Sequence, residues 1–299
     1  MKLHIALLLA LSAPITLFAA DDISSQMNSI TESAFTEVSE QMTIQVNLSG
    51  KQRMLTQKMT KEALLISLGI NTEENKKNLD ASINLFDKIL IGLQKGDESL
   101  KLIKTSDVET LAQLDKVGQL WKTFKSSLNS FKQDNKNKQS LTDVTIGNLP
   151  LLSAMDKAVS LYVVNSGSDL NDLATVVNLS GKQRMLTQKM TKEFLLVAKG
   201  FNISENQQSL DTTTKQFETV LQGLKNGNKS LALPETKDKN IQAQLNMVSQ
   251  SWDEFYKVLE DKGSSKKNEM LQKVEKLNLV VLTEMNKAVK MYEEKSKHL

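Results

Sequence analysis

One segment of 17 residues occurs twice in this chain, letter for letter. VNLSGKQRMLTQKMTKE spans residues 46–62 and recurs at 177–193, 131 positions further along. At the same offset Phe86 corresponds to Phe217, but most of the two copies has drifted apart. Self-similarity at a fixed period indicates tandem copies of one structural unit, so the fold must be one that a single pattern can build twice.

Each copy has the pattern of a helical bundle. Apolar residues recur at helical spacing, and the chain has only 3 prolines and 12 glycines to interrupt them. We predict breaks between helices at 69–72, 95–97 and 134–138, and in the second copy at 200–204, 226–228 and 262–264. The interpretation is an all-α fold of two tandem antiparallel four-helix bundles, packed side by side as a pseudo-dimer.

The two copies are expected to meet at a turn near residues 165–169. Gly167 can end a helix there by adopting a left-handed conformation. The alternative is one continuous helix over about 141–199, because a single glycine costs a helix only about 1 kcal/mol. We prefer the turn and predict two domains, at 21–167 and 168–299.

Residues 1–20 have the composition of an export signal peptide. Lys2 precedes an apolar run at 5–11, and Ala19-Ala20 forms a cleavage site before Asp21. An uncleaved anchor is the alternative, although the run is short for a bilayer span. No later segment approaches about 18 consecutive apolar residues, so we expect a mature chain in the periplasm without a transmembrane segment.

Several classes of function lack the residues that they need. The chain has no cysteine, and its two histidines are His4, in the signal peptide, and His298, next to the last residue. A catalytic triad, a haem ligand pair and the usual zinc sites are therefore not expected. Lysine and glutamate are spread along the chain, which has a net charge of +3 and no sign of a nucleic-acid groove. We expect neither an enzyme nor a cofactor or metal.

Arginine occurs at only two places among 38 basic residues. Arg53 and Arg184 share one position of the repeated segment, one helical turn after Gly50 and Gly181. A guanidinium offers a planar fork of donors that fits a planar oxyanion, and it stays charged; an ammonium offers no such fork. Glycine weakens a helix, so we expect a partner helix or a ligand to approach closely there. These four residues form the candidate ligand-binding site.

Other interpretations of these residues stay open. A partly buried arginine commonly pairs with Asp or Glu, and a glycine on a helix face commonly marks tight packing. The methionines of the repeated segment and the two tryptophans are interpreted as core residues without a binding role: Met54, Met59, Met185, Met190, Trp121 and Trp252.

The run Asn47–Met59 resembles the signature of the PilJ-type domain, the N-terminal domain of type IV pili methyl-accepting chemotaxis transducers. It is also similar to the periplasmic sensor domain of nitrate/nitrite-responsive histidine kinases. The resemblance covers each half, roughly residues 25–165 and 169–297. It implies a four-helix bundle that senses outside the inner membrane.

In nitrate-binding members of that family, one nitrate lies between the first helices of two subunits, held by an arginine from each and by backbone near the preceding glycine. The resemblance carries these roles to Arg53 and Gly50 in the first copy and to Arg184 and Gly181 in the second. Members usually have one copy of the domain, whereas this chain has two. We therefore expect one chain to supply both halves of the site.

The expected function is a periplasmic sensor that holds one nitrate, nitrite or similar small oxyanion between Arg53 and Arg184. It would signal to a membrane chemoreceptor or a histidine kinase. The alternative is a ligand-free helical adaptor of a pilus or chemosensory envelope complex, in which both arginines form salt bridges. An acidic side chain against each arginine would favour the adaptor, and a positive cleft would favour the ligand.

Overall fold

The computed structural model describes residues 20–167, 171–263 and 267–295. Within these ranges the chain forms two sets of four long α-helices, each set with one short 3₁₀ helix, and no strand longer than an isolated bridge. The first set is α1 (Ala20–Ser67), α2 (Thr72–Lys95), η1 (Glu98–Leu100), α3 (Val108–Gln133) and α4 (Lys138–Asn165). The second set is α5 (Asn171–Lys199), α6 (Ile203–Asn226), η3 (Lys229–Leu231), α7 (Lys239–Leu259) and α8 (Asn268–Lys295).

Most helix ends lie at the predicted breaks, but α3 and α7 begin at Val108 and Lys239, about ten residues after the breaks predicted at 95–97 and 226–228. Gly96 and Gly227 follow α2 and α6 with φ of +88° and +79°, a conformation that glycine adopts without strain. α4 ends at Asn165, and Gly167 has φ of +85°, so the helix stops at the expected turn and does not continue into α5.

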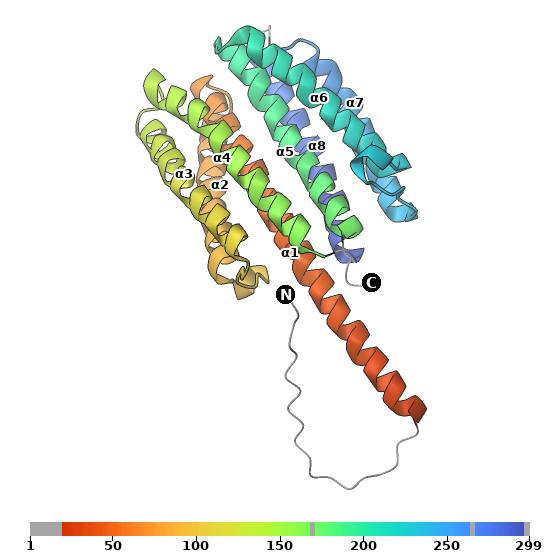
Figure 1. The fold of residues 1–299 in the computed structure, drawn as a ribbon. Coiled ribbons are helices and arrows are strands. Elements are labelled where there is room, and N and C mark those ends of the chain that lie inside the picture. Colours follow the sequence, from red (N-terminus) through yellow and green to blue (C-terminus); the bar gives the residue numbers. More distant parts are fainter. Residues whose placement is uncertain (1–19, 168–170, 264–266, 296–299) are drawn as a thin grey trace.

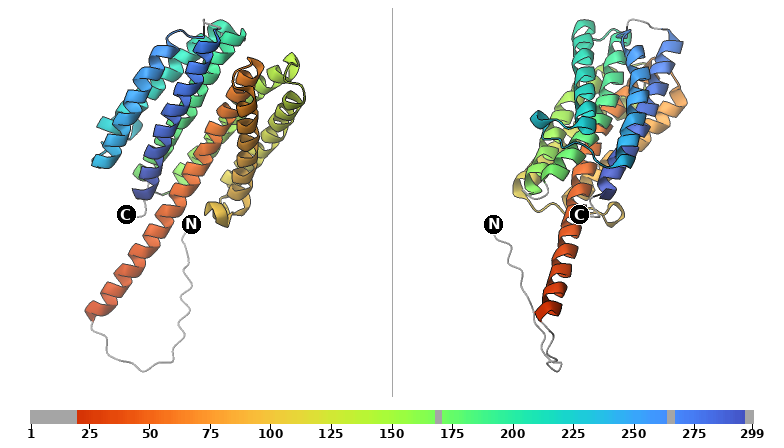
Figure 2. Two further views of the ribbon diagram at one scale, coloured as in Figure 1. Left: turned by 180° about the vertical axis from the view of Figure 1, so that it is seen from behind. Right: turned by 90° about the vertical axis from the view of Figure 1, so that its right-hand side faces the viewer.

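The two four-helix bundles lie side by side, with α1 and α5 in contact along the middle of the molecule (Figure 1). This is the most extensive contact between the repeats, and smaller contacts join α4 to α5 and α1 to α8. The N-terminal part of α1 projects beyond the bundles (Figure 2). The prediction of an all-α fold of two tandem bundles packed as a pseudo-dimer is confirmed.

Each bundle has an aromatic stack between two of its helices, α2 and α3 in the first and α6 and α7 in the second. Phe86 and Trp121 stack with ring centroids 4.1 Å apart, and Phe217 and Trp252 lie 4.4 Å apart in the second bundle. Both tryptophans are buried, as are the four methionines of the repeated segment. These residues are core residues, as the sequence predicts.

Most of the repeated segment is buried, because α1 and α5 pack against their own bundle and against each other. Residues 49–62 are buried apart from the half-buried Lys51 and Lys58, and residues 180–193 show the same pattern. The interface between α1 and α5 is therefore the part of the fold that positions the candidate site.

Among the helices described, none has a stretch that is both long and apolar enough to cross a bilayer.

Candidate functional site

Arg53 and Arg184 reach across the α1–α5 interface to equivalent residues of the opposite repeat. Nη2 of Arg53 donates to Oδ1 of Asn178 at 2.7 Å and to its carbonyl oxygen at 3.3 Å. Nη2 of Arg184 donates to Oδ1 of Asn47 at 2.7 Å and to its carbonyl oxygen at 3.4 Å. Since Asn47 and Asn178 share one position of the repeated segment, a pseudo-twofold axis relates the two contacts.

Gly50 and Gly181 leave room for the arginine one turn later on their own helix. A Cβ atom at Gly50 would lie 3.3 Å from Nη2 of Arg53, and one at Gly181 would lie 3.3 Å from Nη2 of Arg184. From the sequence, a partner helix or a ligand was predicted to make this close approach. The structure shows that the guanidinium of the same helix makes it.

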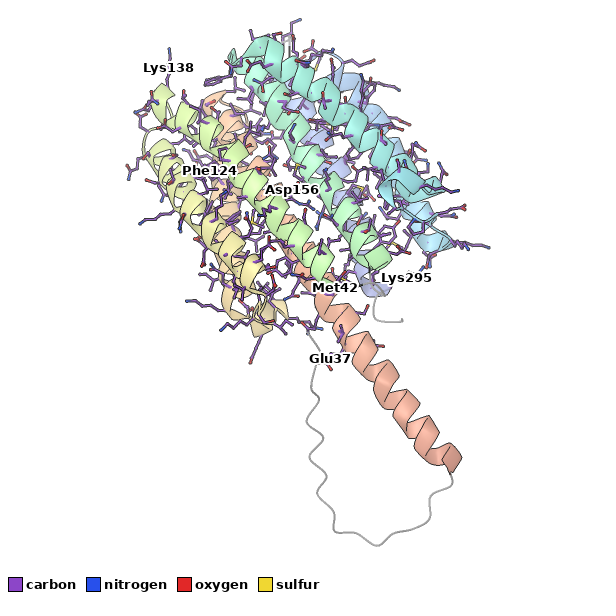
Figure 3. All side chains as sticks on the ribbon, in the orientation of Figure 1. Glu37, Met42, Phe124, Lys138, Asp156 and Lys295 are labelled. Carbon is purple, nitrogen blue, oxygen red and sulfur yellow. The ribbon has the colours of Figure 1, made fainter. Side chains whose placement is uncertain are left out.

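The first repeat adds an ion pair to this arrangement. Nη1 of Arg53 donates to Oδ1 of Asp156 at 2.7 Å. Asp156 projects from α4, which packs against α5, and its side chain is half exposed (Figure 3). The corresponding position of the second repeat is Asn286, which carries no charge. The two halves of the site are thus similar in shape and different in charge.

A second carboxylate, Glu293 of α8, acts on the other half. Nδ2 of Asn47 donates to Oε2 of Glu293 at 2.7 Å, which leaves Oδ1 of Asn47 to accept from Arg184. The position corresponding to Glu293 in the first repeat is Val163. Each repeat therefore contributes one carboxylate to the interface, from a different position.

Burial lowers the pKa of both guanidiniums. The pKa of Arg184 falls to about 10, because burial and the charge of Arg53 outweigh the opposing charge of Glu293. For Arg53 the attraction of Asp156 opposes the effect of burial. Burial and the charge of Arg184 also lower the pKa of Lys51. These interactions link three cations and two carboxylates, a net charge of +1.

Each arginine keeps one unpaired donor in the interior. Nε of Arg53 and Nε of Arg184 are buried and have no hydrogen-bond partner among the residues that the structure describes. Buried donors nearly always have an acceptor. In the same segments, Oε1 of the equivalent Gln52 and Gln183, and of Gln57 and Gln188, is also buried without a partner among the described residues.

An acid against each arginine was expected for the adaptor. Arg53 pairs directly with Asp156. Arg184 instead has Asn286 at the corresponding position and interacts with the charge of Glu293 without a direct bond.

A second reciprocal network, which the sequence analysis missed, crosses the same interface. Nζ of Lys61 donates to Oδ1 of Asn278 at 3.3 Å, and Nζ of Lys192 donates to Oδ1 of Asn148 at 3.0 Å. All four side chains are buried, and burial lowers the pKa of each lysine to about 8. The lysines belong to the repeated segment, so its identical polar residues could have indicated this network.

Two glutamines of the repeated segment support this network from within each repeat. Nε2 of Gln57 donates to Oδ1 of Asn148 at 3.0 Å, and Nε2 of Gln188 donates to Oδ1 of Asn278 at 3.0 Å. Each asparagine oxygen thus accepts from one donor of its own repeat and one of the other. Across the described ranges, no three His, Cys, Asp or Glu residues are grouped in a way that could hold a metal ion.

Comparison with known proteins gives matches to chemotaxis transducers. The model of the PilJ family, described as "Type IV pili methyl-accepting chemotaxis transducer N-term", matches residues 35–145 and 168–276. The methyl-accepting chemotaxis protein McpN of Pseudomonas aeruginosa is 29% identical over 123 residues, which are 41% of this chain and 22% of that protein. The chain thus spans about a fifth of the length of this relative. These similarities indicate a role in sensing and signal transduction. Because the two matched segments cover most of the sequence, the chain belongs to the PilJ family and carries two tandem copies of its domain.

Proposed function

We propose that this chain is a periplasmic sensor that binds one small oxyanion, most simply nitrate or nitrite, between its two repeats. The supporting observation is the pair of buried guanidiniums of Arg53 and Arg184, related by the pseudo-twofold axis and each with an unpaired Nε. A planar monoanion between them would accept from both Nε–H groups and would neutralise the net charge of +1. Gly50 and Gly181 would contribute to this site because, without a side chain, each leaves room for the guanidinium one turn later.

The position of Arg53 suggests how binding would be transmitted. α1 is one continuous helix from Ala20 to Ser67, and its N-terminal part extends beyond both bundles (Figure 2). An anion that contacts Arg53 and Arg184 would favour one packing of α1 against α5 over others. A shift of α1 would then move its projecting end, where a membrane chemoreceptor or a histidine kinase could detect it.

Calorimetric titration of the purified mature chain with sodium nitrate tests the proposal, with sodium chloride as the control. We expect one nitrate per chain. Arg53→Lys and Arg184→Lys keep the charge and lose the planar fork, so each should abolish binding while circular dichroism shows an intact fold. Wild-type affinity in both variants would refute the arginine site. Parallel titrations with nitrite, sulfate and acetate identify the preferred anion, and two nitrates per chain would mean that each repeat binds alone.

The ligand-free adaptor is supported by one specific observation, the ion pair of Arg53 with Asp156 at 2.7 Å. Asp156→Asn distinguishes the oxyanion sensor from the adaptor. The variant removes the carboxylate and gives the first repeat an asparagine, the residue that the second repeat has at Asn286. If an anion competes with Asp156 for Arg53, this variant should bind nitrate at least threefold more tightly. If the ion pair is only structural, Tm should fall and no anion should restore it.

Asp143→Asn is the matched control, since it makes the same charge change on an exposed position of α4. Nitrate affinity and Tm in this control should equal the wild-type values.

A further inference from the structure

The two repeats differ on the outer side of the bundle, at the aromatic stack. In the first repeat, Nζ of Lys125 donates to Oδ2 of Asp87 at 2.5 Å and lies 6.0 Å from the ring centroid of Trp121. Nε1 of Trp121 donates to Oδ1 of the same carboxylate at 2.6 Å. The first repeat therefore holds its own ammonium group between a carboxylate and an indole ring.

The second repeat keeps the carboxylate and the indole and changes the third residue. Nε1 of Trp252 donates to Oε2 of Glu218 at 2.5 Å, as in the first repeat. The residue corresponding to Lys125 is Tyr256. Its ring centroid lies 5.4 Å from that of Trp252, and 44% of the residue is exposed. A second aromatic ring thus stands where the first repeat has its lysine.

A cavity of about 640 Å³ lies at this place in the second repeat, on the α6 and α7 side of the bundle. Glu218, Trp252 and Tyr256 line it. A volume of this size lies within the range of about 300–1,000 Å³ that is usual for small-molecule sites. The cavity is separate from the interface of α1 and α5, so it is independent of the proposed oxyanion site.

The charges around the cavity also differ between the repeats. The lining of the cavity includes Asp211, Glu218, Asp253 and Lys215, a net charge of −2. Nζ of Lys262 lies 2.7 Å from Oδ2 of Asp211, and with this ammonium counted the net charge around the cavity is −1. The positions that correspond to the lining residues in the first repeat have two carboxylates and three lysines, a net charge of +1: Asp80, Asp87, Lys88, Lys122 and Lys125.

We propose that this cavity binds a small organic ammonium compound, with Glu218 as the counter-ion and the rings of Trp252 and Tyr256 as cation–π partners. The ammonium would contact Glu218 and the indole of Trp252, as Nζ of Lys125 contacts Asp87 and lies near Trp121 in the first repeat. Glu218 also accepts from Nε2 of Gln222 at 2.9 Å through Oε1, and a carboxylate has lone pairs for a further donor. The aromatic pair contributes because a cation near the face of an indole or phenol ring is attracted by the ring.

The first test is titration of the mature chain with 1,5-diaminopentane, because one end of this molecule reproduces the side chain of a lysine. Saturable binding of one diamine per chain is expected. The control is 1,5-pentanediol, which has the same length and no charge and should not bind. Binding of the diol as tightly as the diamine, or failure of the diamine titration to saturate, would overturn the proposal.

Two variants locate the binding site. Tyr256→Lys supplies the residue of the first repeat, so its own ammonium should pair with Glu218, as Lys125 pairs with Asp87, and weaken diamine binding at least tenfold without lowering Tm. Glu218→Gln removes the counter-ion but keeps an oxygen that accepts from Trp252, and it should also weaken binding at least tenfold. Asp143→Asn, the exposed control on α4, should bind like the wild type. Wild-type affinity in both cavity variants would place the amine elsewhere and refute the site.

Discussion

Raising the pH from 7 to 9.5 should stabilise the folded protein, because two lysines are buried at the repeat interface. Lys61 and Lys192 each donate to an asparagine of the opposite repeat, at 3.3 Å and 3.0 Å. Loss of hydration disfavours the charged ammonium, and it lowers the pKa of each lysine from 10.5 to about 8. The neutral amine is thus the form that the folded interior prefers.

The direction of the effect follows from the protons that each state binds. The unfolded chain keeps these lysine protons up to a pH of about 10.5, whereas the folded chain releases them at a pH of about 8. Between these values the unfolded state binds more protons, so the free energy of unfolding rises with pH. With these pKa values, each lysine adds about 2 kcal/mol between pH 7 and 9.5, or about 4 kcal/mol for an independent pair.

Neighbouring charges and other titrating groups define the useful pH range. Glu62 raises the pKa of Lys61 and Lys58 lowers it, but burial is the largest effect. Above the chosen range the pKa of Arg184, about 10, adds a further rise in stability. The pKa of Tyr162 is raised to about 12, so ionising it costs stability above pH 10. The lysines are therefore best measured below pH 9.5.

The assay is chemical unfolding followed by circular dichroism at pH 7 and 9.5, at one ionic strength. In the double variant Lys61→Met/Lys192→Met both buried ammonium groups are lost, while Gln57 and Gln188 still donate to the two asparagines. We expect the free energy of unfolding to rise with pH in both proteins, and to rise much less in the variant, where only groups such as Lys51 with a lowered pKa remain. An equal rise in both proteins, or a fall in the wild type, would show that the lysines are not the cause.

Two further pairs of substitutions test how glycines shape the interface and the bundle ends. Gly50→Ala should destabilise the protein by about 1–2 kcal/mol, despite the better helix propensity of alanine, because the new Cβ would lie 3.3 Å from the buried Nη2 of Arg53. Gly118→Ala, in open space inside α3, should instead stabilise it by up to about 1 kcal/mol. Gly263→Ala should cost more than about 2 kcal/mol, because its Cβ would meet the carbonyl oxygen of Phe194 at 2.3 Å and φ is +74°. Gly69→Ala has the same kind of φ, +75°, and no neighbour within 4 Å, so it should cost only about 1–2 kcal/mol. Equilibrium unfolding of the four variants checks both pairs, and equal effects within either pair would contradict the steric argument.

The fold was largely predictable from the sequence because its signals are local. Glycines at Gly96 and Gly227 and the apolar stripes act within a few residues, so they define helix ends and buried faces without knowledge of the rest of the chain. The tandem packing was predicted from the repeated segment, which is identical in the two copies although the sequence around it differs. Local patterns were enough for the architecture.

The partners of the site residues were harder to predict, because they come from other helices. Asp156 contacts Arg53 because of the register in which α4 packs against α1. The apolar periodicity of the sequence does not define that register to within one residue. The hydrogen bonds of Lys61 and Lys192 to asparagines of the opposite repeat depend on how the two bundles dock. Local sequence patterns contain even less information about that docking. Composition did, however, point to Arg53 and Arg184, because arginine occurs nowhere else in the chain.

This packing couples the two 17-residue segments, which is one explanation of their identity; recent gene conversion is the alternative. Around the pseudo-twofold axis, Arg53 meets Asn178 and Arg184 meets Asn47, so a change in either segment alters both its own bundle and the opposite repeat. On the outer faces no such coupling exists, and there Tyr256 stands in the second repeat where Lys125 stands in the first. The axis therefore favours one site shared by both repeats, whereas the periphery allows each repeat to acquire a ligand of its own. This division is why we propose an oxyanion site between α1 and α5 and a separate site for an ammonium compound against α6 and α7.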